Sequence, residues 1–458
     1  MADSEIVNDR TPLLERKGSI NSIDSCNKAG FRSLENDDMK IKAVIDTESA
    51  KYGITNVIDV IDDSDYMPPD VGNGLDNPDF ADIVCIFSVA FDTRAGNIIE
   101  WYLPNDCNVD GIEFRAMASG SHRVQTDFIY FKRGQLYGLA CFENMPVDNA
   151  CERGARMKSV GVLAVTYTSL HYHMSFLKKQ VRQLLENPGS YTEMEAYYET
   201  HKGSFPTFNA FSDNFDTDNT KLWNNIMPLM KITHPAGCFS QFLNFFSERI
   251  FVLWKLALLK KRIIFFSPPP IGVVCYRVYC TISLTAHHMS ELGYWCAQPF
   301  FYVNIADMDN LDSEKVYVAC TTEKIFQSKT NLYDLYVDNQ NFISDIPMIQ
   351  KLMCTSYADR KKYEELCKLQ AQMATCQNGE INSHEENETW FMRYFTNLND
   401  RLFRTLLDVS KSEDKQWTIE HMHTVGLDPV NDRTFIMELV DTYGIDIVAA
   451  PDTLCCSP

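Results

Sequence analysis

Basic residues and long hydrophobic stretches are scarce in this sequence. Its 458 residues carry a formal net charge of −20, and because phosphate contacts need a basic surface, general nucleic-acid binding is not expected. No apolar run reaches the roughly 18 residues that a transmembrane helix requires. The first residues also lack the basic and then apolar pattern of a signal peptide. Together these absences predict a cytoplasmic protein.

Common catalytic and metal-binding signatures are missing as well. None of the 15 cysteines forms a Cys-x-x-Cys pair, so we expect buried thiols rather than a zinc or redox motif. The sequence contains neither a Gly-x-x-x-x-Gly-Lys-Ser/Thr phosphate loop nor a Gly-x-Ser-x-Gly nucleophile elbow. Two histidine pairs are each spaced two residues apart on predicted helices, which turns their side chains to different faces. They are His171 with His173 and His421 with His423. We therefore predict no metal ion, no cofactor and no covalent catalysis.

Residues 1–78 form an acidic segment with few aromatic residues. Such a composition cannot bury enough apolar surface to offset the entropy lost on ordering, so the segment is predicted to be disordered. Asp9, Leu13 and Leu14 fit the acidic dileucine pattern that vesicle-coat adaptors bind. Matches to a motif this short are mostly accidental in a chain without a membrane span.

Residues 79–202 have the pattern of a small α+β domain. Apolar segments rich in β-branched residues alternate with turn residues, which predicts antiparallel strands joined by short connections. The expected strands cover 83–91, 98–103, 126–132, 135–142 and 157–165. A short helical insert is expected at 109–118. A long helix with an apolar face follows from Leu170, and Pro188 with Gly189 ends it.

Residues 226–342 are predicted to form a second unit of α/β type, after a polar linker at 203–225. The unit begins with a helix at 239–261, a strand at 263–266, a helix at 271–286 and a strand at 300–305. The first strand is an unalternated apolar run, which is typical of a strand buried on both faces. A strand, a crossover helix and a second strand give a parallel sheet with helices packed on it.

Residues 343–458 have a helical pattern. The expected helices cover 359–375, 390–407, 418–425 and 432–443. The second is strongly amphipathic, because Phe391, Phe395 and Leu402 lie along one stripe while Arg393 and Arg404 lie opposite. The C-terminal part is therefore predicted to be all-α.

Several of these stretches resemble the DENN domain family. The central ones are LWKLALLKKRIIFFSPPP, PFFYVNI, KVYVACTTEKIF and LYDLYVDNQN, and the upstream ones are FDTRAGNIIEWYLP, DFIYF and ERGARMKSVGVL. The resemblance covers roughly residues 80–450. It implies a longin-like N-terminal half, a parallel α/β DENN core and an all-α C-terminal part.

The resemblance also implies a function. DENN proteins are guanine nucleotide exchange factors for Rab-family GTPases, or relatives of such factors, so a Rab GTPase is the expected partner. The cytoplasmic protein would then be recruited to vesicle membranes in membrane trafficking. Exchange needs no covalent step, because the factor acts by binding the nucleotide-free GTPase more tightly than the loaded form. By the same resemblance, the surface for the GTPase spans the longin-like half and the α/β core.

Two alternative hypotheses stay open. Arg153 stands in an Arg-Gly loop before the fifth predicted strand, where folliculin-like longin–DENN proteins carry an arginine that stimulates GTP hydrolysis. The competing interpretation is a turn residue paired with Glu152 or Asp148, since exposed arginines mostly form weak surface pairs. The third hypothesis is a scaffold without catalytic activity, whose longin-like half pairs with a second longin-domain protein.

Overall fold

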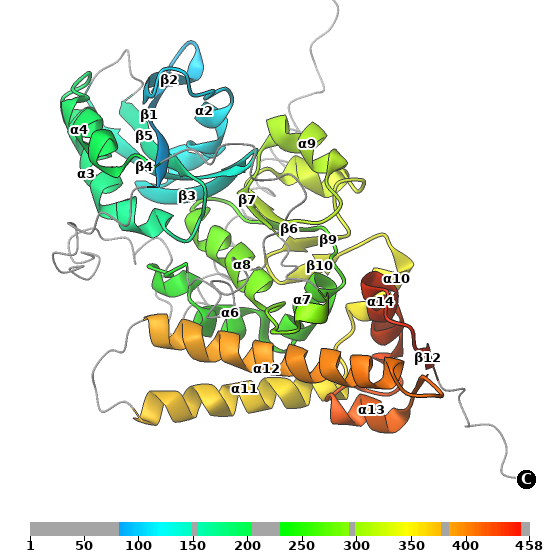
Figure 1. Cartoon of the computed structure of the whole chain (residues 1–458). Coiled ribbons are helices and arrows are strands. Elements are labelled where there is room, and N and C mark those ends of the chain that lie inside the picture. The colour runs from blue at the N-terminus through cyan, green and yellow to red at the C-terminus, as the bar shows by residue number, and fades with distance from the viewer. Residues whose placement is uncertain (1–81, 149–153, 204–229, 293–297, 377–383, 450–458) are drawn as a thin grey trace, which may run out of the picture. The chain divides into compact units, whose positions relative to one another are not determined.

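The computed structural model describes residues 82–148, 154–203, 230–292, 298–376 and 384–449, all of which belong to one compact unit of residues 73–458. A mixed sheet of ten strands runs through this described part of the chain (Figure 1). The strands are β1 (Ile83–Asp92), β2 (Gly96–Leu103), β3 (Thr126–Arg133), β4 (Leu136–Pro146), β5 (Ala155–Ala164), β6 (Ile263–Phe266), β7 (Pro299–Tyr302), β8 (Val318–Thr321), β9 (Leu335–Asp338) and β10 (Asn341–Ile343). Their order across the sheet is β10-β9-β6-β8-β7-β3-β4-β5-β1-β2.

Strands β1 to β5 pair in antiparallel fashion, as their alternation predicts. Helix α3 (Met174–Glu186) packs against β4 and β5 and buries an apolar stripe that includes Leu177. The sequence pattern does not predict the next helix, α4 (Thr192–His201). The reason is that α4 buries only Met194 and Tyr198, so it has no apolar stripe long enough to show a helical period.

Strands β6 to β9 form a parallel arrangement, which confirms the predicted α/β class of this segment. β6 lies between β8 and β9 and is parallel to both, and β7 is parallel to β8. Helix α8 (Gly272–Ser283) packs against β7, β8 and β3. The crossover connection thus runs over the sheet as the strand and helix spacing predicts.

The prediction of one continuous helix over 239–261 is wrong. Two helices occupy this stretch, α6 (Phe239–Phe246) and α7 (Ile250–Leu258), with a 3-10 turn at Ser247–Arg249 between them. Ser247 has a φ of 51°, which lies outside the right-handed helical region. Both helices are apolar and buried, so the apolar spacing continues across the break and hides it in the sequence.

A buried lysine on α7 anchors the C-terminal helices. The Nζ atom of Lys255 lies 2.6 Å from Asp359 Oδ2 and 2.6 Å from Asp432 Oδ1. Asp359 belongs to α11 (Tyr357–Cys376), and Asp432 directly precedes α14 (Arg433–Tyr443). Because a buried charge is tolerated only with partners, these two carboxylates explain how a lysine can sit inside an apolar helix.

The C-terminal part is helical but not all-α, which corrects the prediction. The remaining helices are α10 (Pro347–Leu352), α12 (His384–Ser410) and α13 (Ile419–Thr424). Two short strands, β11 (Gln416–Trp417) and β12 (Val448–Ala449), pair in parallel. Strands of two residues leave no period in the sequence, so their pairing could not be predicted. Among the helices of the described residues, none is both long and apolar enough to span a bilayer.

The antiparallel and parallel groups of strands join at β3 and β7. Phe131 on β3 is the register partner of Phe301 on β7. The ring of Phe301 packs against Tyr130, Tyr137 and Tyr167, with centroid distances of 5.5, 6.3 and 5.5 Å. This aromatic cluster buries the seam between the two groups and makes them one continuous sheet.

Candidate functional site

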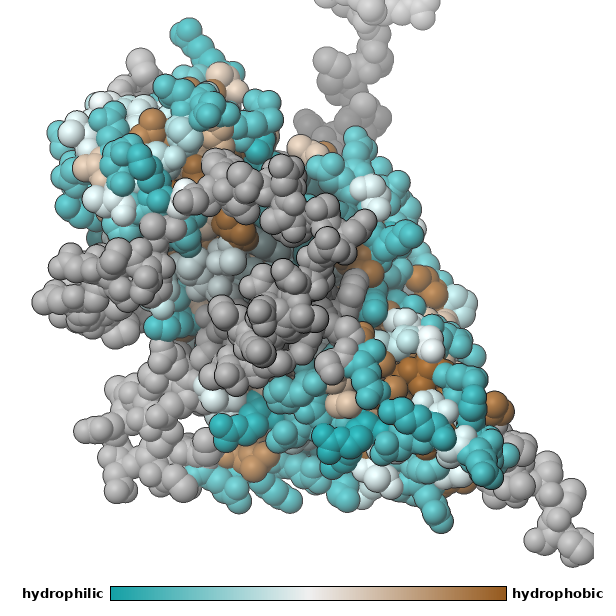
Figure 2. Space-filling model, viewed as in Figure 1, coloured by the Kyte–Doolittle hydropathy of each residue, from teal (hydrophilic) through white to brown (hydrophobic). Residues whose placement is uncertain are grey.

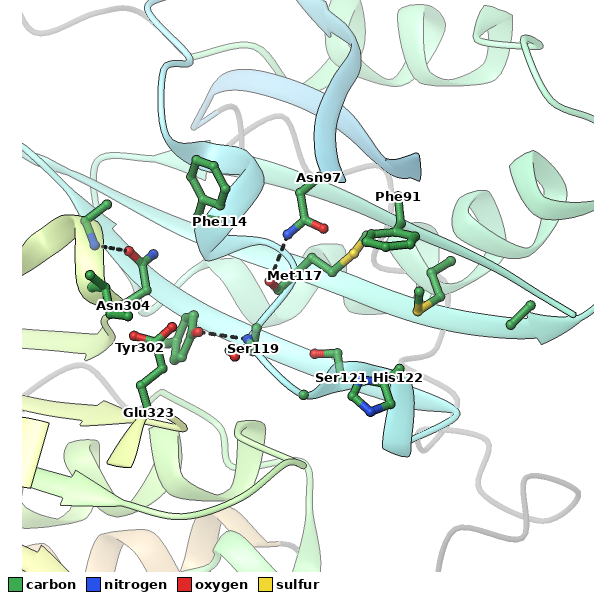
Figure 3. Close-up of a pocket in the computed structure, with 16 residues that line it drawn as sticks. Phe91, Asn97, Phe114, Met117, Ser119, Ser121, His122, Tyr302, Asn304 and Glu323 are labelled. Atoms are coloured by element: carbon green, nitrogen blue, oxygen red, sulfur yellow. Dashed lines mark hydrogen bonds between the residues drawn. The ribbon is translucent and has the colours of Figure 1, made fainter. Parts of the chain in front are cut away.

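A pocket of about 740 Å³ opens near this seam, between the β1–β5 group and the segments that follow β7 and β8 (Figure 3). Its walls are mainly apolar. Phe91, Phe114 and Met117 come from the first group, whereas Tyr302 and Ile305 come from the second. The volume is within the range of cavities that bind small ligands.

Polar groups line one side of the pocket. The backbone N–H of Ser119 donates to the hydroxyl of Tyr302 at 3.1 Å, and the backbone N–H of Ala306 donates to Asn304 Oδ1 at 2.8 Å. Asn304 Nδ2 and the hydroxyl of Ser121 are buried and have no hydrogen-bond partner among the described residues. Because buried polar groups are normally paired, these two atoms are suited to contact a bound molecule.

An ion pair connects the two sides of the pocket. Arg115 ends helix α2 (Ile112–Arg115), and Asp307 ends the 3-10 helix η11 (Ile305–Asp307). The guanidinium of Arg115 contacts the carboxylate of Asp307, although 192 positions separate the two residues in the sequence. Asp307 Oδ2 also accepts a hydrogen bond from the backbone N–H of Asn304 at 3.0 Å. The pair therefore fixes α2 against η11.

Burial is the main influence on the pKa of two carboxyl groups, Glu323 in the pocket wall and Asp307 in the adjoining ion pair. It raises the pKa of Asp307 more than the neighbouring charge of Arg115 lowers it. Burial also raises the pKa of Glu323, and the charge of Asp307 raises it further. A further negative charge would be unfavourable beside these carboxylates. This side of the pocket is therefore better suited to apolar groups or neutral hydrogen-bonding groups.

Two large apolar side chains stand exposed at the pocket. Phe114 is 47% exposed on α2, and Ile305 is 53% exposed on η11. Elsewhere, on the coloured part of the face in Figure 2, apolar residues form separate spots within a mostly hydrophilic surface. Exposed apolar side chains next to a pocket favour contact with another protein. We define the pocket rim as Phe114 and Ile305.

The site residues predicted from the sequence are not part of this pocket as described. Arg153 and the dileucine residues Asp9, Leu13 and Leu14 lie outside the residues that the structure describes, so they stay predictions. Residues Ser119 to His122 form part of the pocket wall, with Gly120 at a φ of 85°. The sequence does not indicate this role, because its only local pattern there is that of turn residues.

Two of the four histidines named from the sequence make structural contacts in the described residues. His173 is buried, with Nδ1 at 2.8 Å from the hydroxyl of Tyr197 and Nε2 at 3.2 Å from Asp82 Oδ1. Nδ1 of His421 accepts a hydrogen bond from the backbone N–H of Thr418 at 3.1 Å, at the start of α13. These contacts fix helix ends and loops rather than the pocket.

Comparison with known proteins gives the family of this sequence. The sequence matches the family model described as DENN domain-containing protein 11 over residues 86–345. A protein of that name from Xenopus laevis is 51% identical over 378 residues, which covers 82% of this chain and 87% of the relative. One from Danio rerio is 50% identical over 381 residues, covering 82% and 77%, and one from Rattus norvegicus is 49% identical over 381 residues, covering 82% and 83%.

These matches confirm the resemblance to DENN-domain proteins. More narrowly, the chain belongs to the DENN domain-containing protein 11 family.

Proposed function

We propose that the protein promotes exchange of GDP for GTP on a Rab-family GTPase in membrane trafficking. Family membership supports the proposal, because DENN proteins are exchange factors for Rab GTPases or relatives of such factors. The structural observation that carries it is the pocket at the seam of the sheet, whose rim comes from both strand groups. In this proposal residues 79–202 are the longin-like half, 226–342 the DENN core, and 343–458 the downstream helical part.

The chemistry of the pocket suits a factor that acts by binding. An exchange factor must hold a loop of the GTPase away from the phosphates and magnesium, and it needs tight contact with the nucleotide-free form to do so. The apolar side chains of Phe114 and Ile305 can supply the buried contact area. Asn304 Nδ2 can donate a hydrogen bond to that loop, and the hydroxyl of Ser121 can donate or accept one. Because α2 and η11 supply the rim together, both strand groups are needed for activity.

The test is release of a fluorescent GDP analogue from a panel of purified Rab GTPases, in solution and on anionic vesicles. We expect the full chain to accelerate release from at least one Rab and to retain that Rab in its nucleotide-free state. Ile305→Ser should slow this release by about tenfold, the effect of losing about 1.4 kcal/mol at a buried interface contact.

A matched control separates this effect from general damage. Ile419, on α13, is 57% exposed, so Ile419→Ser makes the same chemical change at similar exposure and should leave release unchanged. If no Rab releases nucleotide faster and none is retained nucleotide-free, the exchange proposal is wrong. Pairing with a second longin-domain protein would then become the leading hypothesis. Equal rates for the two variants would keep exchange but place the contact away from this pocket.

The same panel tests the activator hypothesis for Arg153. Single-turnover GTP hydrolysis is measured with the wild-type chain and with Arg153→Ala. An arginine finger accelerates hydrolysis by about 10³- to 10⁵-fold, so the variant should lose nearly all stimulation if the hypothesis holds. No stimulation by the wild type, or equal stimulation by both, removes the hypothesis.

A further inference from the structure

Three buried side-chain atoms in the wall of the pocket lack a hydrogen-bond partner within the described ranges of the chain. They are Ser121 Oγ, Asn304 Nδ2 and Glu323 Oε2. As whole residues, Ser121 is only 2% exposed and Asn304 only 4%. An unpaired polar group inside a protein is unfavourable, because it has lost its contacts with water and gained nothing in return. Three such atoms around one cavity therefore indicate that a bound molecule supplies their partners.

The hydrogen bonds of Asn304 fix which atom it presents to the pocket. Its Oδ1 atom accepts from the backbone N–H of Ala306 at 2.8 Å, and its own backbone N–H donates to Asp307 Oδ2 at 3.0 Å. The first of these bonds sets the orientation of the side-chain amide, since only the oxygen can accept. Figure 3 shows the nitrogen on the side away from that bond. Asn304 therefore offers a hydrogen-bond donor to a molecule in the pocket.

The position of Asn304 and Glu323 in the sheet brings them to the same edge. Asn304 lies two residues after the end of β7, and Glu323 lies two residues after the end of its parallel neighbour β8. Tyr302 is the register partner of Cys320, and Figure 3 shows Asn304, Tyr302 and Glu323 together on one side of the pocket. The carboxyl ends of parallel strands are a common place for ligands in α/β proteins.

The chemistry of these two side chains selects one kind of ligand group. Asn304 Nδ2 needs an acceptor, whereas the carboxylate of Glu323 needs a donor. A ligand carboxylate would be repelled by Glu323, and an ammonium group would leave Asn304 without an acceptor. A carboxamide carries an acceptor and a donor in one planar, neutral group, so it can satisfy both. The apolar side chains of Phe91, Phe114 and Met117 suit an apolar body attached to that group.

We propose that the pocket binds a neutral small molecule that carries a carboxamide on an apolar body. The ligand carbonyl accepts from Asn304 Nδ2, its N–H donates to Glu323 Oε2, and Ser121 pairs with a further polar group of the same molecule. This inference goes beyond the exchange activity and does not depend on it, because binding is measured on the chain alone. One consequence does rest on the proposed function. A bound molecule fills the space assigned to the GTPase loop, so it would inhibit exchange.

The first experiment compares three probes that share a benzene ring but differ in charge and hydrogen bonding. Benzamide, benzoate and benzylamine are each titrated into the full chain near neutral pH, and binding is followed by ligand-observed NMR. Benzamide should bind at about 1 mM, as expected for a molecule of this size, and about tenfold more tightly than either charged probe. Absence of benzamide binding up to about 20 mM, or equal or tighter binding of a charged probe, would overturn the proposal.

Two variants with nearly unchanged shape assign the contacts. Asn304→Asp keeps an oxygen for the N–H of Ala306 but replaces the donor with an acceptor. It should weaken benzamide binding by about tenfold and strengthen benzylamine binding. Glu323→Gln removes the negative charge, so benzoate should then bind within about threefold of benzamide. General damage to the fold would weaken every probe, whereas these variants shift preference between probes in opposite directions of charge.

A matched control repeats the first change outside the pocket. Asn341 is exposed on β10, at one edge of the sheet, so Asn341→Asp should leave all three affinities unchanged. Benzamide binding that is equally strong in Asn304→Asp and wild type would contradict the assigned donor. A Glu323→Gln chain that still rejects benzoate would contradict the assigned acceptor. Neither result bears on GDP release, so failure here and failure of the exchange proposal can be told apart.

Discussion

At the scale of single residues, the carboxylate of Asp127 fastens a helix to the sheet. Asp127 lies on β3, and its oxygens accept hydrogen bonds from the backbone N–H groups of Ile271 at 2.7 Å and Gly272 at 3.0 Å, where α8 begins. A Cβ atom at position 272 would lie 2.5 Å from the Phe128 carbonyl oxygen, so only glycine allows this approach. The two N–H groups lower the pKa of Asp127, but burial raises it more strongly, to about 6.

Asp127 is therefore expected to give the protein an unusual pH dependence. The folded pKa of about 6 exceeds the ordinary value of 3.8, so between these values the folded state binds more protons than the unfolded state. Stability from this group then falls as pH rises through that window, by at most about 1.4 kcal/mol per pH unit. Asp127→Asn replaces the titrating carboxyl with a neutral amide, so the variant should lose this part of the pH dependence.

Urea unfolding at several pH values between about 4 and 6 measures this effect. The free energy of unfolding of Asp127→Asn should decline less with rising pH than that of the wild type. Other carboxyl groups contribute equally to both proteins and cancel in the difference. Parallel curves would mean that Asp127 is ionised in the folded protein throughout this range.

At the scale of elements, the ion pair of Arg115 and Asp307 ties α2 to η11. Both residues are buried, and burial raises the pKa of Asp307 despite the adjacent guanidinium. The attraction of Arg115 therefore offsets less than the full desolvation of this carboxylate. The larger effect of the pair is to fix the position of the rim, because neither charge can be left alone in the interior.

Removing one partner should thus be worse than removing both. Asp307→Asn is expected to lower the free energy of unfolding by about 3 kcal/mol, since it strands the charge of Arg115. Adding Arg115→Met should recover part of that loss. An exposed pair, Lys415 with Asp446, serves as the control, and Asp446→Asn should change stability by less than about 0.5 kcal/mol. Chemical unfolding of the wild type and these three variants gives the comparison, and a double variant no more stable than Asp307→Asn would refute the coupling.

At the scale of the whole molecule, the acidic segment of residues 1–78 is expected to add nothing to the stability of the compact unit. The compact unit is residues 73–458, so the two overlap only at residues 73–78. The composition of the segment offers little apolar surface to bury. Deleting residues 1–78 should therefore leave the Tm within about 2 °C, a change well below 1 kcal/mol for a protein of this size. A thermal scan of the full and shortened chains tests this. A fall of about 10 °C would show that the segment packs on the folded unit.

Local sequence patterns were sufficient to predict most of the individual helices and strands. Strands such as β1 and β6 were predictable because a strand buried on one or both faces shows its burial in consecutive residues. Helix α4 was not predictable, because it buries only Met194 and Tyr198. The break at Ser247 was hidden by apolar spacing that continues across it.

The sequence by itself determined the order and type of most elements and, through resemblance, the family, because both depend on residues close together along the chain. Tertiary structure alone decided the pairing of Phe131 with Phe301, the partners of Lys255 and the pocket. The Arg115–Asp307 contact joins residues 192 positions apart. No local period records such a contact, since it arises only when the sheet brings distant segments together.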